Sequence, residues 1–298
     1  MYSLQICTIA ILLVSVYAYV PYGTWNNNRE QSCTNCVCGA PVRNRRVING
    51  KPANRIDYPW VVILRKNGYY KCTGSLLTPR HVITAAHCLV DSYAQQFQVA
   101  AGRYNVPGYD ASEKQYRVRA LHVHEYYNSK NFDNDIGIME LESPVQLNDD
   151  MQLICLPGES HVDYSGLVGT VVGWGRTDKN SGNVFNTLHT GDVPILSTAQ
   201  CSRSLYYQGQ VTQNMMCAGY LQGGRDACIG DSGAPLQVKR EHGSYELAGV
   251  VSWGIGCADP GYPGVYTRVT NYLDWIRART GNECPCRPHS DTSSLLNL

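Results

Sequence analysis

Three short motifs in the chain carry side chains that could together perform acyl transfer. They are TAAHC at 84–88, DND at 133–135 and GDSG at 230–233, and they contain His87, Asp135 and Ser232. A serine hydroxyl is a weak nucleophile at neutral pH and needs a base to take its proton. Histidine titrates in the right range, and a buried carboxylate can hold its tautomer and stabilise the imidazolium. The three motifs together predict a serine hydrolase, whereas each alone is common in unrelated sequences.

The order of the three residues along the chain separates the classes of serine hydrolase. It is His, Asp, Ser here, whereas α/β-hydrolases have Ser, Asp, His and subtilisins have Asp, His, Ser. The pattern Gly-x-Ser-x-Gly of many esterases and lipases is absent. An esterase or lipase is therefore disfavoured.

This order and four further motifs resemble the chymotrypsin/trypsin family of serine proteases. The motifs are YPW at 58–60, GWG at 173–175, SWG at 252–254 and GVYT at 264–267. The resemblance extends from about residue 47 to residue 279. It implies an all-β fold of two six-stranded antiparallel β-barrels, with the active site in the cleft between them and one C-terminal α-helix.

The resemblance also implies a role for each residue of the site. Ser232 is expected to be the nucleophile, His87 the general base and then acid, and Asp135 the carboxylate that orients the histidine. The backbone N–H groups of Gly230 and Ser232 are expected to form the oxyanion hole. Ser252 matches the serine that donates a hydrogen bond to the buried aspartate.

The expected substrate specificity depends on Asp226, which lies six residues before the nucleophile. In trypsin-like members an aspartate there lies at the base of the primary pocket. A desolvated carboxylate needs a cationic partner, so cleavage after Arg or Lys is expected. Gly254 and Gly264 match the pocket walls, and with Ser252 they complete the substrate-binding set. Ala227 offers no hydroxyl to a lysine, which favours Arg.

An activation site is indicated where the family's first strand begins. Cleavage after Arg46 is expected to free the ammonium group of Val47, which could insert and pair with Asp231 and thereby order the pocket. The resemblance thus implies a zymogen. Because the cut follows an arginine, either the enzyme itself or a separate activating protease could perform it.

The apolar run near the N-terminus and the number of cysteines suggest that the chain is exported. Residues 4–16 form an apolar run that is too short to span a bilayer, and Ala18 suits signal peptidase. We therefore expect a signal peptide at 1–18, a cysteine-containing propeptide at 19–46, a protease domain at 47–281 and a cysteine-containing tail at 282–298. The chain has 13 cysteines, a number typical of secreted, extracellular proteins.

The cysteines left after removal of the signal peptide are even in number. The resemblance implies four disulfides: Cys72–Cys88, Cys201–Cys217, Cys228–Cys257 and Cys38–Cys155. Four cysteines remain, namely Cys33, Cys36, Cys284 and Cys286. Either they form disulfides that join the propeptide to the tail, in an undetermined pairing, or they bind a metal. An oxidising compartment disfavours the metal.

The pattern of apolar residues agrees with a β-rich fold. Short apolar runs at 60–64 and 69–77 flank an Asn-Gly pair, which predicts a hairpin. Further short strands are predicted at these positions: 118–123, 136–141, 169–173, 236–239 and 247–253. Apolar residues at Val269, Tyr272, Leu273 and Ile276 predict a helix near the C-terminus. The segments before residue 47 and after residue 281 are expected to be irregular.

Two departures from the family pattern bear on stability and cofactors. Ala234 replaces a second glycine after the nucleophile and would cost about 1 kcal/mol if that position needs a positive φ. Arg103 stands where a calcium ligand is usual, in a loop that also contains Asp110 and Glu113. We expect no metal and no other cofactor, with Arg103 paired to one of these acids.

The charge and hydrophobicity of the chain limit the classes of molecule that it is expected to bind. The net charge of +1 argues against nucleic acid, and no later apolar stretch reaches the length needed to span a membrane. The expected partners are protein or peptide substrates with Arg or Lys before the scissile bond, an activating protease, and serpin or Kunitz-type inhibitors. The alternative function is a catalytically silent homologue that binds partners as an adaptor.

Overall fold

The computed structural model describes residues 37–40, 57–104, 112–175, 187–203, 209–224, 230–241, 243–257, 259–281 and 286–288. The expected signal peptide, Arg46, Val47, Asp226 and Cys228 lie outside these residues. No helix among the described residues has the length and hydrophobicity needed to cross a bilayer.

A tight hairpin begins the first sheet, as the Asn-Gly pair predicts. Asn67 and Gly68 have φ angles of 52° and 84°, the left-handed conformation that a two-residue turn between twisted strands requires. The sheet closes into a barrel in the order β2-β3-β4-β7-β6-β5. Its strands are β2 (Val61–Lys66), β3 (Tyr69–Thr78), β4 (His81–Thr84), β5 (Phe97–Ala101), β6 (Lys114–Val123) and β7 (Gly137–Leu141).

The second sheet also has six antiparallel strands, in the order β10-β13-β12-β11-β8-β9. They are β8 (Val168–Gly173), β9 (His189–Pro194), β10 (Met215–Ala218), β11 (Pro235–Lys239), β12 (Tyr245–Trp253) and β13 (Gly264–Arg268). An isolated bridge between Ile195 and Ala218 joins the two edges of this sheet. The expected architecture of two six-stranded antiparallel barrels is therefore confirmed.

The predicted C-terminal helix is present as the 3₁₀ turn η4 (Val269–Tyr272) followed by α2 (Leu273–Arg279). Its apolar positions are buried, because the 3.6-residue period places them on one face. Among the residues that the structure describes, three short helices were not predicted: η2 (Ala86–Cys88), η3 (Ala94–Gln96) and α1 (Thr198–Arg203).

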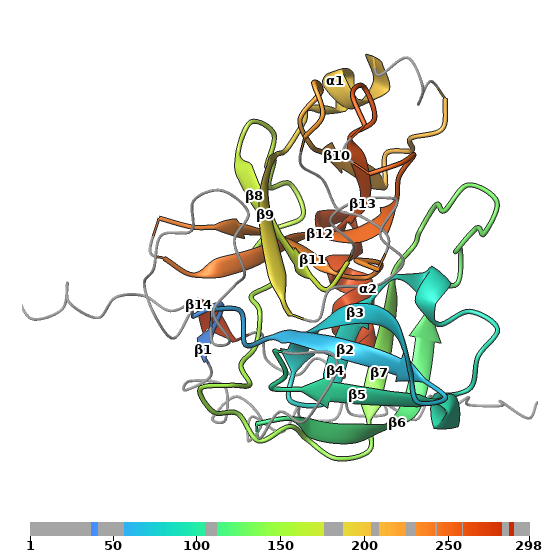
Figure 1. Ribbon diagram of the computed structural model, residues 1–298, viewed down its shortest axis with the longest axis vertical. Coiled ribbons are helices and arrows are strands. Elements are labelled where there is room, and N and C mark those ends of the chain that lie inside the picture. Colours follow the sequence, from blue (N-terminus) through green and yellow to red (C-terminus); the bar gives the residue numbers. More distant parts are fainter. Residues whose placement is uncertain are drawn as a thin grey trace, which may run out of the picture.

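The two sheets pack against each other, with the closed barrel below and the second sheet above in Figure 1. The largest group of buried apolar side chains runs across this junction. It includes Ile63 and Val99 of the first barrel, Leu247 of the second sheet, Trp174 directly after β8, and Ile276 of α2. Segments that are distant in sequence are thus held rigidly together at the junction.

The two ends of the described chain pair with each other, which corrects the expectation that both are irregular. β1 (Val37–Cys38) and β14 (Arg287–Pro288) form a parallel pair. Cys38 Sγ also lies 3.2 Å from the Cys286 carbonyl oxygen. Main-chain pairing between segments about 250 residues apart is a tertiary contact that local composition does not reveal.

Candidate active site

His87 lies on η2, immediately after β4. The disulfide between Cys72 and Cys88 joins this turn to β3. His87 Nδ1 lies 2.8 Å from Asp135 Oδ2, and the His87 backbone N–H donates to Asp135 Oδ1 at 2.9 Å. The imidazole is therefore fixed both through its ring and through its backbone.

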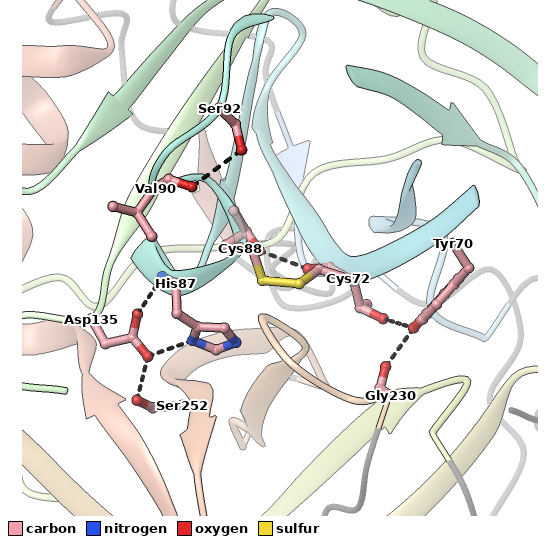
Figure 2. Close-up of a disulfide and its surroundings, with 11 residues drawn as sticks. Tyr70, Cys72, His87, Cys88, Val90, Ser92, Asp135, Gly230 and Ser252 are labelled. Atoms are coloured by element: carbon pink, nitrogen blue, oxygen red, sulfur yellow. Dashed lines mark hydrogen bonds and ion pairs between the residues drawn. A yellow bond between two sulfur atoms is a disulfide. The ribbon is translucent and has the colours of Figure 1, made fainter. Parts of the chain in front are cut away.

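Asp135 lies just before β7 and is fully buried. Its Oδ2 accepts a further hydrogen bond from Ser252 Oγ at 2.5 Å, and its carbonyl oxygen accepts one from Thr267 Oγ1 at 2.6 Å. Figure 2 shows the carboxylate between His87 and Ser252. A carboxylate accepts hydrogen bonds, so Nδ1 of His87 carries a proton and Nε2 is left as a base.

Ser232 lies in a turn that both sheets hold. Its carbonyl oxygen accepts from the Thr73 N–H of β3 at 2.9 Å, and the next N–H, of Gly233, donates to Val251 of β12 at 2.9 Å. Gly233 has a φ of 78°, and a Cβ there would collide with Thr84 and Thr73. Glycine is therefore required where the turn passes the first barrel.

The three residues to which the resemblance assigns the roles of nucleophile, base and orienting carboxylate therefore lie at the junction of the two sheets. β3 binds the Ser232 turn through a backbone hydrogen bond and is joined to the His87 turn by the disulfide of Cys72. In β12, Val251 accepts from the Gly233 N–H, and the next residue, Ser252, donates to Asp135. Among the described residues, no hydrogen bond joins the Ser232 hydroxyl to His87.

Asp231 is nearly buried beside the GWG motif. Its Oδ1 accepts from the Gly175 N–H at 2.7 Å, and a Cβ at Gly173 or Gly175 would collide with the carboxylate. The two glycines therefore make room for an acid that the zymogen hypothesis pairs with Val47, which lies outside the described residues.

Ala234 causes no backbone strain. The positive φ angles of this turn belong to Gly230 and Gly233, at 103° and 78°, and Ala234 is not among the residues with positive φ. Its side chain is fully buried in the apolar core of the second sheet. The cost considered for this substitution does not arise.

The expected substrate-binding glycines face each other. A Cβ placed on Gly254 would lie 4.0 Å from Gly264 Cα, so a larger side chain at position 254 would fill the space between the two glycines. Ser252 contacts Asp135, as described above, and Asp226 lies outside the described residues.

An aromatic wall beside His87 is a feature that the sequence did not predict. The ring of Phe132 lies 6.1 Å from that of His87, edge to face, and stacks on Trp253 at 6.5 Å. Phe132 has a φ of 59°, which is unusual for a bulky residue. Its position three residues before Asp135 was the only local signal.

Three of the four expected disulfides are present. They are Cys38–Cys155, Cys72–Cys88 and Cys201–Cys217. Cys257 is also disulfide-bonded, as is Cys286, with partners outside the described residues. Because Cys286 is oxidised, it offers no thiolate to a metal shared by the four remaining cysteines.

One group of metal-ligating side chains lies close together in the part of the chain that the structure describes, namely Cys72, His87 and Cys88. Its two cysteines form a disulfide, so they do not ligate a metal.

The loop expected to bind no calcium contains a salt bridge. The Arg103 guanidinium is buried and pairs with Glu113, which also accepts from Arg65 Nη1 at 2.9 Å. Burial lowers the pKa of Arg65. Two cations of the protein itself therefore surround the carboxylate that a calcium ion would need.

We expect Glu113→Gln to lower the free energy of unfolding by about 2–3 kcal/mol, because it leaves the buried guanidinium of Arg103 and the partly buried one of Arg65 without their anion. Thermal melting should show a loss of several degrees, and millimolar calcium should leave the melting temperature of the wild type unchanged. The control is Glu159→Gln, whose side chain is 66% exposed. A wild-type melting temperature that rises by several degrees with calcium would contradict this prediction.

The comparisons with known proteins agree with this geometry. The sequence matches the trypsin family model over residues 47–276. It is 38% identical to a trypsin of Xenopus laevis, over 82% of this chain and 95% of that protein. It is 40% identical to the anionic trypsin of Canis lupus familiaris, over 78% and 89%.

It is also 39% identical to the serine protease filzig of Drosophila melanogaster, over 83% of this chain but only 15% of that much longer protein. The fold and the site define a two-barrel serine protease scaffold. The chain belongs to the trypsin family.

Proposed function

We propose that the chain is a secreted serine endopeptidase that is made as a zymogen and cleaves peptide bonds after Arg or Lys. The observation that carries the proposal is the hydrogen-bonded chain from Ser252 to Asp135 to His87. It leaves Nε2 of His87 as a base at the junction where the Ser232 turn is held.

In the proposed reaction, His87 takes the proton of Ser232 as the hydroxyl attacks the scissile carbonyl carbon. The N–H groups of Gly230 and Ser232 stabilise the oxyanion of the tetrahedral intermediate. His87 then protonates the leaving amine, and the acyl-enzyme on Ser232 is hydrolysed by water with His87 again as the base. Asp135 keeps the imidazole in the required tautomer and stabilises its cation.

The preference for Arg or Lys is assigned to Asp226. The absence of side chains at Gly254 and Gly264 supports this assignment, because a Cβ on Gly254 would already lie 4.0 Å from Gly264 Cα and a long cationic side chain needs an unobstructed path to the carboxylate. Family membership supports protein substrates, and serpins and Kunitz-type inhibitors are proposed as further partners.

We expect Asp226→Ser to reduce kcat/KM on arginine peptides about a thousandfold, because the substrate cation would be desolvated without a partner. Hydrolysis rates on paired Arg, Lys, Phe and Ala peptides would measure this change. Turnover of the Phe and Ala peptides serves as the internal control. An unchanged rate on the Arg peptide would mean that another residue sets the specificity.

Activation is proposed to follow cleavage after Arg46, with Val47 as the new partner of Asp231. The test uses the purified full-length precursor with and without trypsin, which is inactivated and removed before the assay. Activity on Arg and Lys peptides only after the cut supports the zymogen. Conversion of the precursor without added protease would identify self-activation.

The adaptor alternative predicts a different result. Cleaved protein with Val47 exposed would then be inactive on all four peptides. Ala234, which replaces a glycine next to the nucleophile turn, would favour this alternative if it strained the turn, but its backbone is not among those with positive φ.

A further inference from the structure

Tyr70 of β3 extends from the first barrel to the turn that contains Gly230. Its hydroxyl donates to the Gly230 carbonyl oxygen at 2.5 Å, and its oxygen lies 2.8 Å from Thr73 Oγ1. A phenol has one proton, so the Thr73 hydroxyl is the donor in the second bond. Figure 2 shows the Tyr70 hydroxyl directed at Gly230, on the opposite side of the Cys72–Cys88 disulfide from Asp135.

A second bond from β3 holds the other end of the same turn. The Thr73 N–H donates to the Ser232 carbonyl oxygen at 2.9 Å. The segment from Gly230 to Ser232 is therefore attached at both ends to one strand of the opposite barrel. A fixed carbonyl also fixes the plane of the peptide to which it belongs.

Gly230 is the flexible end of this segment. Its φ of 103° is in a region that glycine enters freely, and glycine has several other conformations of similar energy. An external hydrogen bond is therefore needed to select one orientation of its carbonyl.

We propose that Tyr70 is a positioning residue for the oxyanion hole. By holding the Gly230 carbonyl against the first barrel, its hydroxyl fixes the plane of the Gly230–Asp231 peptide. This peptide lies in the chain between the N–H groups of Gly230 and Ser232, so fixing it limits how those two groups can turn and keeps both directed at the carbonyl oxygen of the substrate. This inference rests on the function proposed above and adds a residue outside the three catalytic side chains.

The phenol is suited to this task because it stays protonated. Burial of its hydroxyl end, together with the nearby carboxylate of Asp231, raises the pKa of Tyr70 well above its ordinary value. A neutral hydroxyl can therefore donate to Gly230 throughout the neutral pH range.

The test is Tyr70→Phe, with Tyr69→Phe as the matched control. Tyr69 is the preceding residue of the same strand and is 80% exposed. In the activated full-length protein, Tyr70→Phe should lower kcat about tenfold with KM within twofold, because the Gly230 carbonyl loses its donor. Affinity for a peptide aldehyde ending in arginine, which forms a tetrahedral adduct, should fall by a similar factor. Binding of benzamidine, which needs no oxyanion hole, should be unchanged, and Tyr69→Phe should match the wild type in all four quantities.

Other outcomes overturn the inference in distinguishable ways. If Tyr70→Phe weakens the binding of the peptide aldehyde and the binding of benzamidine by the same factor, the role of Tyr70 is structural. If kcat is unchanged while the wild type is active, the proposed function stands and the role of Tyr70 is refuted. A wild type that is inactive after the cut refutes both.

A second variant covers failure of Tyr70→Phe to fold. Thr73→Val removes the hydroxyl that donates to Tyr70 but keeps the backbone N–H that binds Ser232. It should lower kcat about threefold with benzamidine binding unchanged, and an unchanged kcat would count against the inference.

Discussion

Replacing Ser232 by alanine is expected to lower kcat on an arginine peptide by about five to six orders of magnitude, because the reaction then proceeds without a nucleophile on the enzyme. The turn should keep its shape. It is held through the Ser232 carbonyl and the Gly233 N–H, and neither contact uses the side chain that is removed.

The measurement is steady-state hydrolysis by the activated protein, combined with benzamidine binding to count folded sites. Binding should equal that of the wild type, since the pocket does not depend on the serine hydroxyl. The control is Ser165→Ala, which removes a hydroxyl from the loop before β8 and should leave kcat within twofold. A Ser232→Ala enzyme that retained a hundredth of the wild-type rate would refute the assignment of the nucleophile.

Asp135→Asn is the second substitution with a very large expected effect, a loss of about four orders of magnitude in kcat. The carboxylate accepts from the backbone N–H and Nδ1–H of His87 and from the Ser252 hydroxyl. An amide has one oxygen, so its NH₂ group must face either the backbone N–H or the imidazole. If the NH₂ group faces Nδ1, the ring proton moves to Nε2 and the base is lost.

This explanation makes a spectroscopic prediction beside the kinetic one. Nitrogen NMR of His87 should show a proton on Nδ1 in the wild type and on Nε2 in Asp135→Asn. The control is Asp133→Asn, two residues earlier in the same motif. Its carboxylate accepts from Thr212 and Asn214 instead, so kcat should change only a few-fold. A kcat for Asp135→Asn within tenfold of the wild type would show that the aspartate does not fix the tautomer.

Local features of the fold follow from the sequence alone. The Asn67–Gly68 turn is predicted because its residue types tolerate positive φ, and the helix that ends the fold because its apolar residues repeat with the helical period. The motifs around His87 and Asp135 are recognisable because the chemistry restricts which side chains can serve. The structure places these two in contact.

Some of the strands that the sequence did not predict carry little β signal of their own. β9 reads HTGDVP and contains a glycine, an aspartate and a proline, all of which are depleted in strands. It forms a strand because it pairs with β8 along its whole length, and it lies at an edge of the sheet. The two-residue strands β1 and β14 are shorter than any periodicity that could reveal them.

The support of the active site is likewise a property of the folded chain. Tyr70 and Gly230 are 160 residues apart, and Asp135 and Ser252 are 117 apart. Nothing in the composition around Tyr70 distinguishes it from Tyr69, yet one is bonded to Gly230 and the other is largely exposed. Residue types and spacing restrict the chemistry, since few side chains can act as nucleophile or base. The partners that orient those groups are selected by the packing of two barrels, which brings together atoms that the order of residues keeps far apart.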